Sequence, residues 1–246
     1  METITSRQNE KIKALAKLKM QKERKKRQKF IAEGFRVCKT ICQSGLCPEK
    51  IYSTKNKLED AKKIISEDKI VIASDEVMAK ISSAATPSGL LGLFPIKKAP
   101  NANTIGPGIV LLQISDPGNM GTLIRTCAAM GFQSVVTIEG VDPWNPKAIQ
   151  ASAGQIANVD LFPWTWETLI ENKKDLTLIA LVVKDGSSPQ EIDFKNALLV
   201  IGSESHGIPE QLISDCDKKL TLQMPGKTES LNAAVAGSIA MYLAKK

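Results

Sequence analysis

The sequence predicts an α/β protein, with a mostly parallel β-sheet in its C-terminal half and a smaller α/β unit before it. From residue 109 onward, short apolar segments typical of buried strands alternate with helical segments. A shorter alternation precedes it, and the stretch between the two is rich in Pro, Gly and Asn, as expected for a linker. The predicted division is a basic arm (1–29), a small domain (30–95), a linker (96–108) and a C-terminal domain (109–246).

The composition excludes several classes of protein. Of the 246 residues, 43% are hydrophobic and 24% are charged, which is typical of soluble globular proteins. The longest apolar runs are too short to cross a bilayer, and the pattern of the first residues leads us to expect no secretory signal. Five cysteines without a CxxC pair, and a single histidine, His206, argue against a disulfide framework and a zinc site. We therefore expect a cytoplasmic protein without membrane association or metal.

The positive charge is concentrated at the N-terminus. The net charge of the chain is +7, but residues 1–30 alone carry +8. Ile12, Leu15 and Ala16 fall on one helical face, which predicts a short helix there, whereas residues 22–29 are strongly basic and lack apolar side chains. Such a cluster favours contact with RNA or DNA phosphates through counterion release, although a solvated, frayed terminus has the same composition.

The elements expected in the small domain follow its apolar pattern. The first helix stops at Gly45, and Ser74 is placed to cap the last one. In order, the predicted elements are a helix over 31–43, a strand over 50–53, a helix over 58–66, a strand over 69–73, a helix over 74–82 and a strand over 89–94.

In the C-terminal domain, four apolar strands are predicted over 109–114, 134–138, 176–183 and 197–201, with helices over 121–130, 146–152 and 230–245. In open parallel sheets, ligands bind in the loops beyond the carboxyl ends of the strands. The loops that contain polar side chains framed by glycines are residues 115–120, 202–209 and 222–230.

Each of these loops, taken alone, has a structural explanation. Asn119 and Ser230 are suitable helix caps, Arg125 is suitable for a surface, and Glu204 for holding loop backbone. Three such loops following three strands in order are harder to explain in this way. The pattern therefore predicts one shared site.

The segments 116–131, 199–208 and 222–236 together resemble the motifs of the SpoU (TrmH-type) branch of the SPOUT RNA methyltransferases. The resemblance covers residues 109–246, and residues 30–95, with Ala-Glu-Gly-Phe-Arg at 32–36, resemble the small RNA-binding domain that often precedes it. It implies a SPOUT (alpha/beta knot) catalytic domain with a C-terminal deep trefoil knot. It also implies a homodimer.

The activity implied by the resemblance is transfer of a methyl group from S-adenosylmethionine to a ribose 2′-hydroxyl of RNA. The sulfonium is already an activated electrophile, so no metal is expected. Arg125 would serve either as the base or as a clamp on an RNA phosphate. The resemblance places Gly202, Leu222 and Leu231 against the cofactor, and assigns Asn119, Arg125, Glu204, Ser230 and Asn232 to catalysis and substrate positioning.

Three functions remain open from the sequence. The small domain and the basic arm favour a large structured RNA, most of all 23S-type ribosomal RNA. The alternatives are a tRNA 2′-O-methyltransferase and a non-catalytic RNA-binding or ribosome-assembly factor on the same fold. The presence of all five polar residues favours an active enzyme, while no short motif encodes the target nucleotide.

Overall fold

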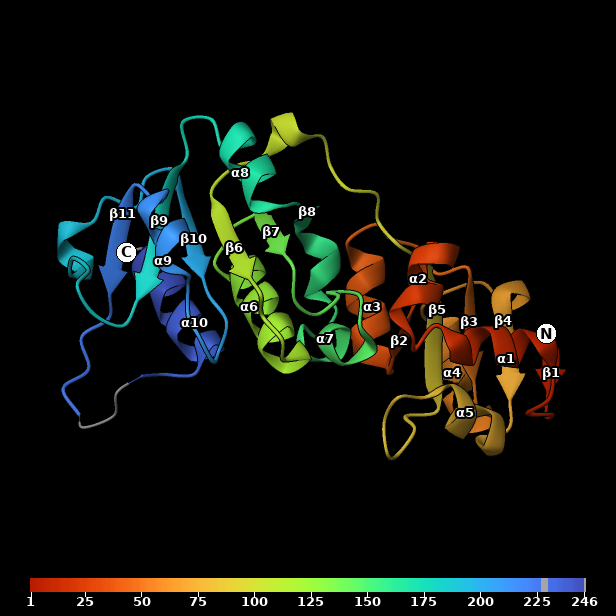
Figure 1. Cartoon of the computed structure of the whole chain (residues 1–246). Coiled ribbons are helices and arrows are strands. Elements are labelled where there is room, and N and C mark those ends of the chain that lie inside the picture. The colour runs from red at the N-terminus through yellow and green to blue at the C-terminus, as the bar shows by residue number, and fades with distance from the viewer. Residues whose placement is uncertain (227–229, 246) are drawn as a thin grey trace. The chain divides into compact units, whose positions relative to one another are not determined.

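The computed structural model describes residues 1–226 and 230–245 (Figure 1). Its contacts divide the chain into two compact units. Unit 1 comprises Met1–Lys98 and Asp142–Ala157, and unit 2 comprises Ala99–Val141 and Asn158–Lys246. Within the described ranges, no helix is both long and apolar enough to span a bilayer.

Unit 1 is built on a five-stranded mixed sheet with the strand order β1-β4-β3-β5-β2. Strands β1, β4 and β3 are parallel, whereas β5 runs antiparallel to both β3 and β2. The strands are β1 (Glu2–Ile4), β2 (Lys29–Glu33), β3 (Lys50–Ser53), β4 (Ile70–Ala73) and β5 (Leu90–Pro95).

The predicted N-terminal arm is part of this unit and not an appendage, which corrects the expected division. Strand β1 pairs with β4, and Ile12 and Leu15 are buried with Val77 in one core cluster. Burial of this apolar stripe holds the segment on the sheet. The helices of unit 1 are α1 (Glu10–Lys17), α2 (Gln21–Arg27), α3 (Phe35–Gln43), α4 (Leu58–Lys62), α5 (Asp75–Ile81) and α7 (Pro146–Ala151).

The helix predicted over 31–43 is wrong at its start. Ile31 and Ala32 belong to β2, and α3 begins only at Phe35. Gly34 lies between them with a φ of 90°, a backbone conformation that glycine adopts readily and that ends the strand. Pairing of β2 with β5 buries residues whose apolar run is compatible with either a helix or a strand.

Arg24 ties residues 142–157 to unit 1, although the sequence placed that segment in the C-terminal domain. Arg24 is only 1% exposed, and its Nη2 lies 2.6 Å from Oδ2 of Asp142. Its Nη1 also donates to the carbonyl oxygens of Leu18 and Lys19. This member of the basic cluster is therefore a buried structural residue, and its guanidinium is not exposed to a polyanion.

Unit 2 contains a six-stranded parallel sheet with the order β11-β9-β10-β6-β7-β8, visible as adjacent arrows in Figure 1. The parallel α/β class predicted from the sequence is confirmed. The strands are β6 (Gly108–Leu112), β7 (Ser134–Ile138), β8 (Asp160–Pro163), β9 (Thr177–Val182), β10 (Ala197–Ile201) and β11 (Lys218–Thr221), and the helices are α6 (Pro117–Ala129), α8 (Trp166–Asn172), α9 (Glu210–Ser214) and α10 (Ala233–Leu243).

The central strands β6 and β10 are buried along their whole length, which explains their continuous apolar sequences. Helix α10 approaches this sheet closely at Gly237, where an added Cβ would lie 2.5 Å from Leu123 of α6 and 2.7 Å from Ile201 of β10. The C-terminal helix is thus seated on β10 and α6. The trefoil knot stays a prediction.

Candidate active site

The first polar loop is organised by the start of α6. Asp116 caps this helix, because its Oδ1 accepts a hydrogen bond of 2.8 Å from the backbone N–H of Asn119, and Pro117 occupies the first turn. The helix therefore begins four residues earlier than the predicted 121–130. Asn119 lies in the first turn of α6. Because Asp116 caps the helix, the Asn119 side chain is available for other contacts.

One chain of hydrogen bonds connects the three predicted loops. Nδ2 of Asn232 donates to Oδ1 of Asn119 at 3.1 Å, and Nδ2 of Asn119 donates to Oε1 of Glu204 at 2.7 Å. Asn232 is itself the N-cap of α10, where its Oδ1 accepts from the backbone N–H of Ala234 at 2.9 Å. Residues after β6, after β10 and at the start of α10 are thus held in one arrangement.

Glu204 accepts further hydrogen bonds from the first loop. Ser115 donates to it through both its hydroxyl, at 3.1 Å, and its backbone N–H, at 3.4 Å. Burial is the largest influence on the pKa of Glu204 and raises it, but the hydrogen bonds from Asn119 and Ser115 outweigh burial and lower the pKa below its ordinary 4.5. Glu204 is therefore a carboxylate at neutral pH.

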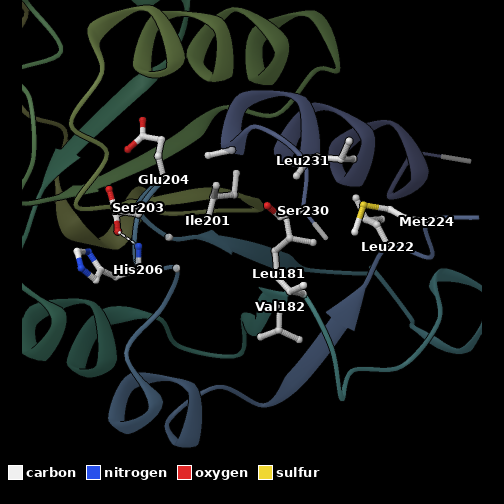
Figure 2. A pocket seen from close by; sticks show the side chains of 16 residues that line it. Leu181, Val182, Ile201, Ser203, Glu204, His206, Leu222, Met224, Ser230 and Leu231 are labelled. Atoms are coloured by element: carbon white, nitrogen blue, oxygen red, sulfur yellow. Dashed lines mark hydrogen bonds between the residues drawn. The ribbon is translucent and has the colours of Figure 1, made fainter. Parts of the chain in front are cut away.

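A pocket of about 370 Å³ lies beside this chain of hydrogen bonds. The pocket is bounded by the ends of β9 and β10 and by the segments on either side of residues 227–229 (Figure 2). Its walls are largely apolar and include Leu181, Ile201, Leu222 and Met224. Ser230 contributes a hydroxyl among these side chains, and Glu204 and His206 lie at one end, as Figure 2 shows. Such a cavity suits a small ligand with an apolar body and a few polar groups.

Gly202 lies where the chain turns directly after β10. Ser203 and Gly207 exchange two backbone hydrogen bonds, of 3.1 and 3.0 Å, which fold the loop back over Gly202. A Cβ on Gly202 would lie 2.3 Å from the carbonyl carbon and oxygen of Gly207. Only glycine permits this close backbone approach on the pocket wall.

The structure brings together seven of the eight predicted site residues. Arg125 is the exception: it is exposed on α6, outside the pocket lining, and its side chain makes no hydrogen bond or ion pair among the described residues. Residues 227–229 of the third predicted loop lie outside the described residues. The pocket is lined by Gly202, Glu204, Leu222, Ser230 and Leu231, and Asn119 and Asn232 adjoin it through the hydrogen-bond chain.

The sequence analysis missed several residues of this site. Ser115 was within a predicted loop but was not assigned a role, although it donates to Glu204. Leu181 and Val182, at the end of β9, and Ile201 of β10 were predicted only as strand residues. A rule that the final residues of each parallel strand face the ligand would have found these three. Among the described residues, no group of three or more His, Cys, Asp or Glu side chains is arranged for a metal ion.

The fold and site of unit 2 define a parallel α/β protein whose ligand pocket lies at the carboxyl ends of its strands, next to an asparagine–asparagine–glutamate hydrogen-bond chain. The SpoU rRNA methylase family model matches residues 107–242. This match covers more than half of the chain, and the protein belongs to that family. A second model, described as an MRM3-like substrate binding domain, matches residues 9–92 and includes most of the segment predicted as an arm.

Two relatives and one solved structure match almost the whole chain. A 23S rRNA (guanosine(2553)-2′-O)-methyltransferase of Bacillus subtilis, RlmP, is 26% identical over 98% of both chains. An uncharacterised tRNA/rRNA methyltransferase of Synechocystis is 29% identical over 99% of this chain and 93% of its own. The crystal structure of an AdoMet-bound rRNA methyltransferase from Sinorhizobium meliloti has a TM-score of 0.88 with 22% identity, covering 99% of this chain and 97% of that one, and shows that the fold is shared.

Proposed function

We propose that this protein transfers a methyl group from S-adenosylmethionine to a ribose 2′-hydroxyl of ribosomal RNA, most favourably 23S-type RNA. The observation that carries the proposal is the hydrogen-bond chain from Asn232 through Asn119 to Glu204, which joins all three family segments beside one pocket. Family membership and the RlmP relative support the reaction class.

The pocket residues fit S-adenosylmethionine. Leu222 and Leu231 supply apolar walls suited to an adenine ring, and Gly202 allows the 203–207 turn to fold back closely at the pocket wall. When bound, the sulfonium supplies an activated methyl group. We assign Gly202, Leu222 and Leu231 to binding the cofactor.

The reacting hydroxyl must be held in line with that methyl group, because a ribose hydroxyl is a weak acid and a poor nucleophile. We assign Asn119, Glu204, Ser230 and Asn232 to positioning the ribose. Asn119, Glu204 and Asn232 are fixed by the hydrogen bonds between them, and Ser230 presents a hydroxyl within the pocket itself. Arg125 has an exposed guanidinium without an internal partner, which suits a bidentate clamp on the adjoining phosphate. A base role is disfavoured by the cost of deprotonating arginine.

The charge distribution supports an RNA substrate. Unit 1 carries a net charge of +11, whereas unit 2 carries −4. A strongly basic unit next in sequence to a methyltransferase unit favours a polyanionic substrate through counterion release. Because RlmP of Bacillus subtilis and RlmB of Acinetobacter baylyi, two relatives named for 23S rRNA methylation, are bacterial, we also propose that the protein acts in the cytoplasm.

We further propose that the protein is a homodimer through α10. Three large apolar side chains share one exposed stripe along this helix: Val235, Ile239 and Tyr242, which are 40 to 52% exposed. Their spacing of four and three residues aligns them on one helical face. A self-complementary stripe of this kind suits an isologous contact with a second copy.

The experiment incubates the protein with methyl-labelled S-adenosylmethionine and, in separate reactions, unmodified 23S rRNA, 16S rRNA and tRNA, followed by alkaline cleavage. A methylated 2′-hydroxyl cannot attack its own phosphate, so the label is expected in a dinucleotide from 23S rRNA. Label in a tRNA dinucleotide would keep the reaction and overturn the substrate. Label in mononucleotides would indicate base methylation, and label in no RNA would favour a non-catalytic RNA-binding factor.

A further inference from the structure

A second cavity, of about 490 Å³, lies within unit 1. Three segments that are distant in sequence form its walls. They are residues 31–34 at the junction of β2 and α3, residues 83–88 between α5 and β5, and residues 146–151 of α7. Nothing in the proposed methyl-transfer reaction uses this cavity.

Glu33 fixes the first wall. Its two carboxylate oxygens accept hydrogen bonds from the Ser82 hydroxyl, at 2.8 and 2.7 Å, and from the backbone N–H of Ser88, at 2.9 Å. The N–H of Ser83 adds a longer one, of 3.4 Å. Because a carboxylate offers about four lone-pair sites, Glu33 is occupied in holding the 83–88 loop. The cavity is therefore not a cation site built around this acid.

A second wall, α7, is held by two features that follow from the fold of unit 1. The buried pair between Arg24 and Asp142 anchors the segment leading into α7. Directly after α7, Gly154 has a φ of 82°, and a Cβ on it would lie 2.7 Å from the carbonyl oxygen of Val37. The segment that follows α7 is thus seated against α3. Both walls are preformed, which lowers the entropic cost of binding a ligand.

The lining combines an apolar floor with polar groups at the mouth. Ile31 and Leu91 are buried beneath the cavity. At the mouth, the side chains of Thr86, Lys147 and Gln150 make no hydrogen bond to any other residue that the structure describes. A nucleotide matches this lining. Its base is flat and largely apolar, with donors and acceptors on its edge, and would lie above the apolar floor. Its negatively charged phosphate would lie beside Lys147.

We propose that this cavity binds one unpaired nucleotide of the RNA substrate, at a site separate from the methyl-transfer pocket. The inference rests on the proposed function in taking RNA as the substrate. The net charge of +11 on unit 1 favours a polyanion over a protein partner or an apolar metabolite. Unpaired bases are also the parts of RNA that proteins read most readily, since they leave their edges accessible.

The test fills the cavity without changing charge. Ala84→Trp places a bulky ring in the lining, and the neighbouring Ala85→Trp, in the same exposed loop but outside the lining, is the matched control. Ala151→Leu reduces the cavity from α7. Filter binding of an unmodified 23S rRNA transcript is expected to weaken about tenfold in Ala84→Trp and Ala151→Leu, as for loss of one base contact, and to stay at the wild-type level in Ala85→Trp. Lys147→Gln is expected to lower the slope of log K against log salt by about one.

The position of the bound nucleotide is tested by crosslinking with a transcript that contains 4-thiouridine. Crosslinks to the wild-type protein are expected in peptides covering residues 83–88 or 146–151. Calorimetric binding of S-adenosylmethionine, in the other unit, is expected to be unchanged in every variant. Wild-type RNA affinity in both cavity variants, or equal loss in Ala84→Trp and Ala85→Trp, would overturn the nucleotide site and leave the proposed function standing. Failure of the wild-type protein to bind either rRNA or tRNA would overturn both.

Discussion

Asn119 and Glu204 are 85 residues apart in sequence, yet the amide of Asn119 donates to the Glu204 carboxylate at 2.7 Å. The same amide accepts from Asn232 through its oxygen, so its orientation is fixed by both partners. A carboxylate whose pKa is held below 4.5 by such donors stays charged, and accepts hydrogen bonds, throughout the neutral range. The arrangement of the three loops that contain Asn119, Glu204 and Asn232 therefore depends on the Asn119 side chain, which contacts both of the others.

Replacing Asn119 with Asp removes the donor and sets a second carboxylate against Glu204. Repulsion between the two charges should separate the loops, so methyl transfer to 23S rRNA is expected to fall at least about tenfold, equivalent to one hydrogen bond to a charged group. Initial rates with labelled S-adenosylmethionine measure this. Asn103→Asp, whose side chain is exposed elsewhere in unit 2, is the control. Equal rates in the two variants would contradict a role in methyl transfer for the hydrogen-bond chain from Asn232 through Asn119 to Glu204.

Arg125→Lys keeps the charge and removes the bidentate fork. If Arg125 clamps a phosphate, most of the methyl transfer is lost because lysine holds that phosphate as a point charge without fixing its orientation. Single-turnover rates at saturating RNA separate orientation from affinity. Near-wild-type turnover in Arg125→Lys would be inconsistent with both the clamp and the base.

Gly202→Ala forces a methyl group to within 2.3 Å of the Gly207 carbonyl, so the turn after β10 must shift. Overpacking of this kind costs about 1–3 kcal/mol, and we expect S-adenosylmethionine to bind roughly tenfold or more weakly by calorimetry. Gly106→Ala is the matched control, since its nearest neighbour to an added Cβ is 4.0 Å away. Unchanged cofactor affinity in Gly202→Ala would remove Gly202 from the cofactor site.

The Arg24–Asp142 pair predicts a contrast in stability. Arg24→Met leaves Asp142 buried and unpaired, which should lower the free energy of unfolding by about 3–5 kcal/mol in urea titrations. Arg27→Met disrupts a solvent-exposed pair with Glu23 in the same helix and should cost only about 0–1 kcal/mol. Similar losses in both variants would show that the buried pair has no special structural role.

The α10 stripe predicts the oligomeric state. The wild-type protein should have a dimeric mass in light scattering at micromolar concentration, whereas Val235→Glu combined with Ile239→Glu should be monomeric, because two carboxylates would be buried without partners. Ile170→Glu, on the exposed side of α8, controls for added charge. A monomeric wild-type protein, or a double variant that remains dimeric, would refute this interface.

The central strands of unit 2 were predictable because burial on both faces requires continuous apolar sequence. Strand β10 (Ala197–Ile201) has the predicted bounds, and β7 (Ser134–Ile138) does as well. The edge strands β8 and β11 and the short helices α8 and α9 were missed, since short segments with mixed polar sequence lack a clear period. The basic cluster was recognisable as a run of charge, but its sequence did not reveal that α2 is a helix with Arg24 buried.

The sequence by itself determined the parallel α/β class, the family motifs and the three loops in which the candidate site lies, because local periodicity and residue type are properties of neighbouring positions. Only the tertiary structure decided which side chains meet. Asn119 reaches Glu204 because the ends of β6 and β10, adjacent in the sheet, lie side by side, and Asp142 joins unit 1 because a buried guanidinium requires a carboxylate from a distant segment. Such contacts depend on the folded path of the chain, which spacing along the sequence does not encode.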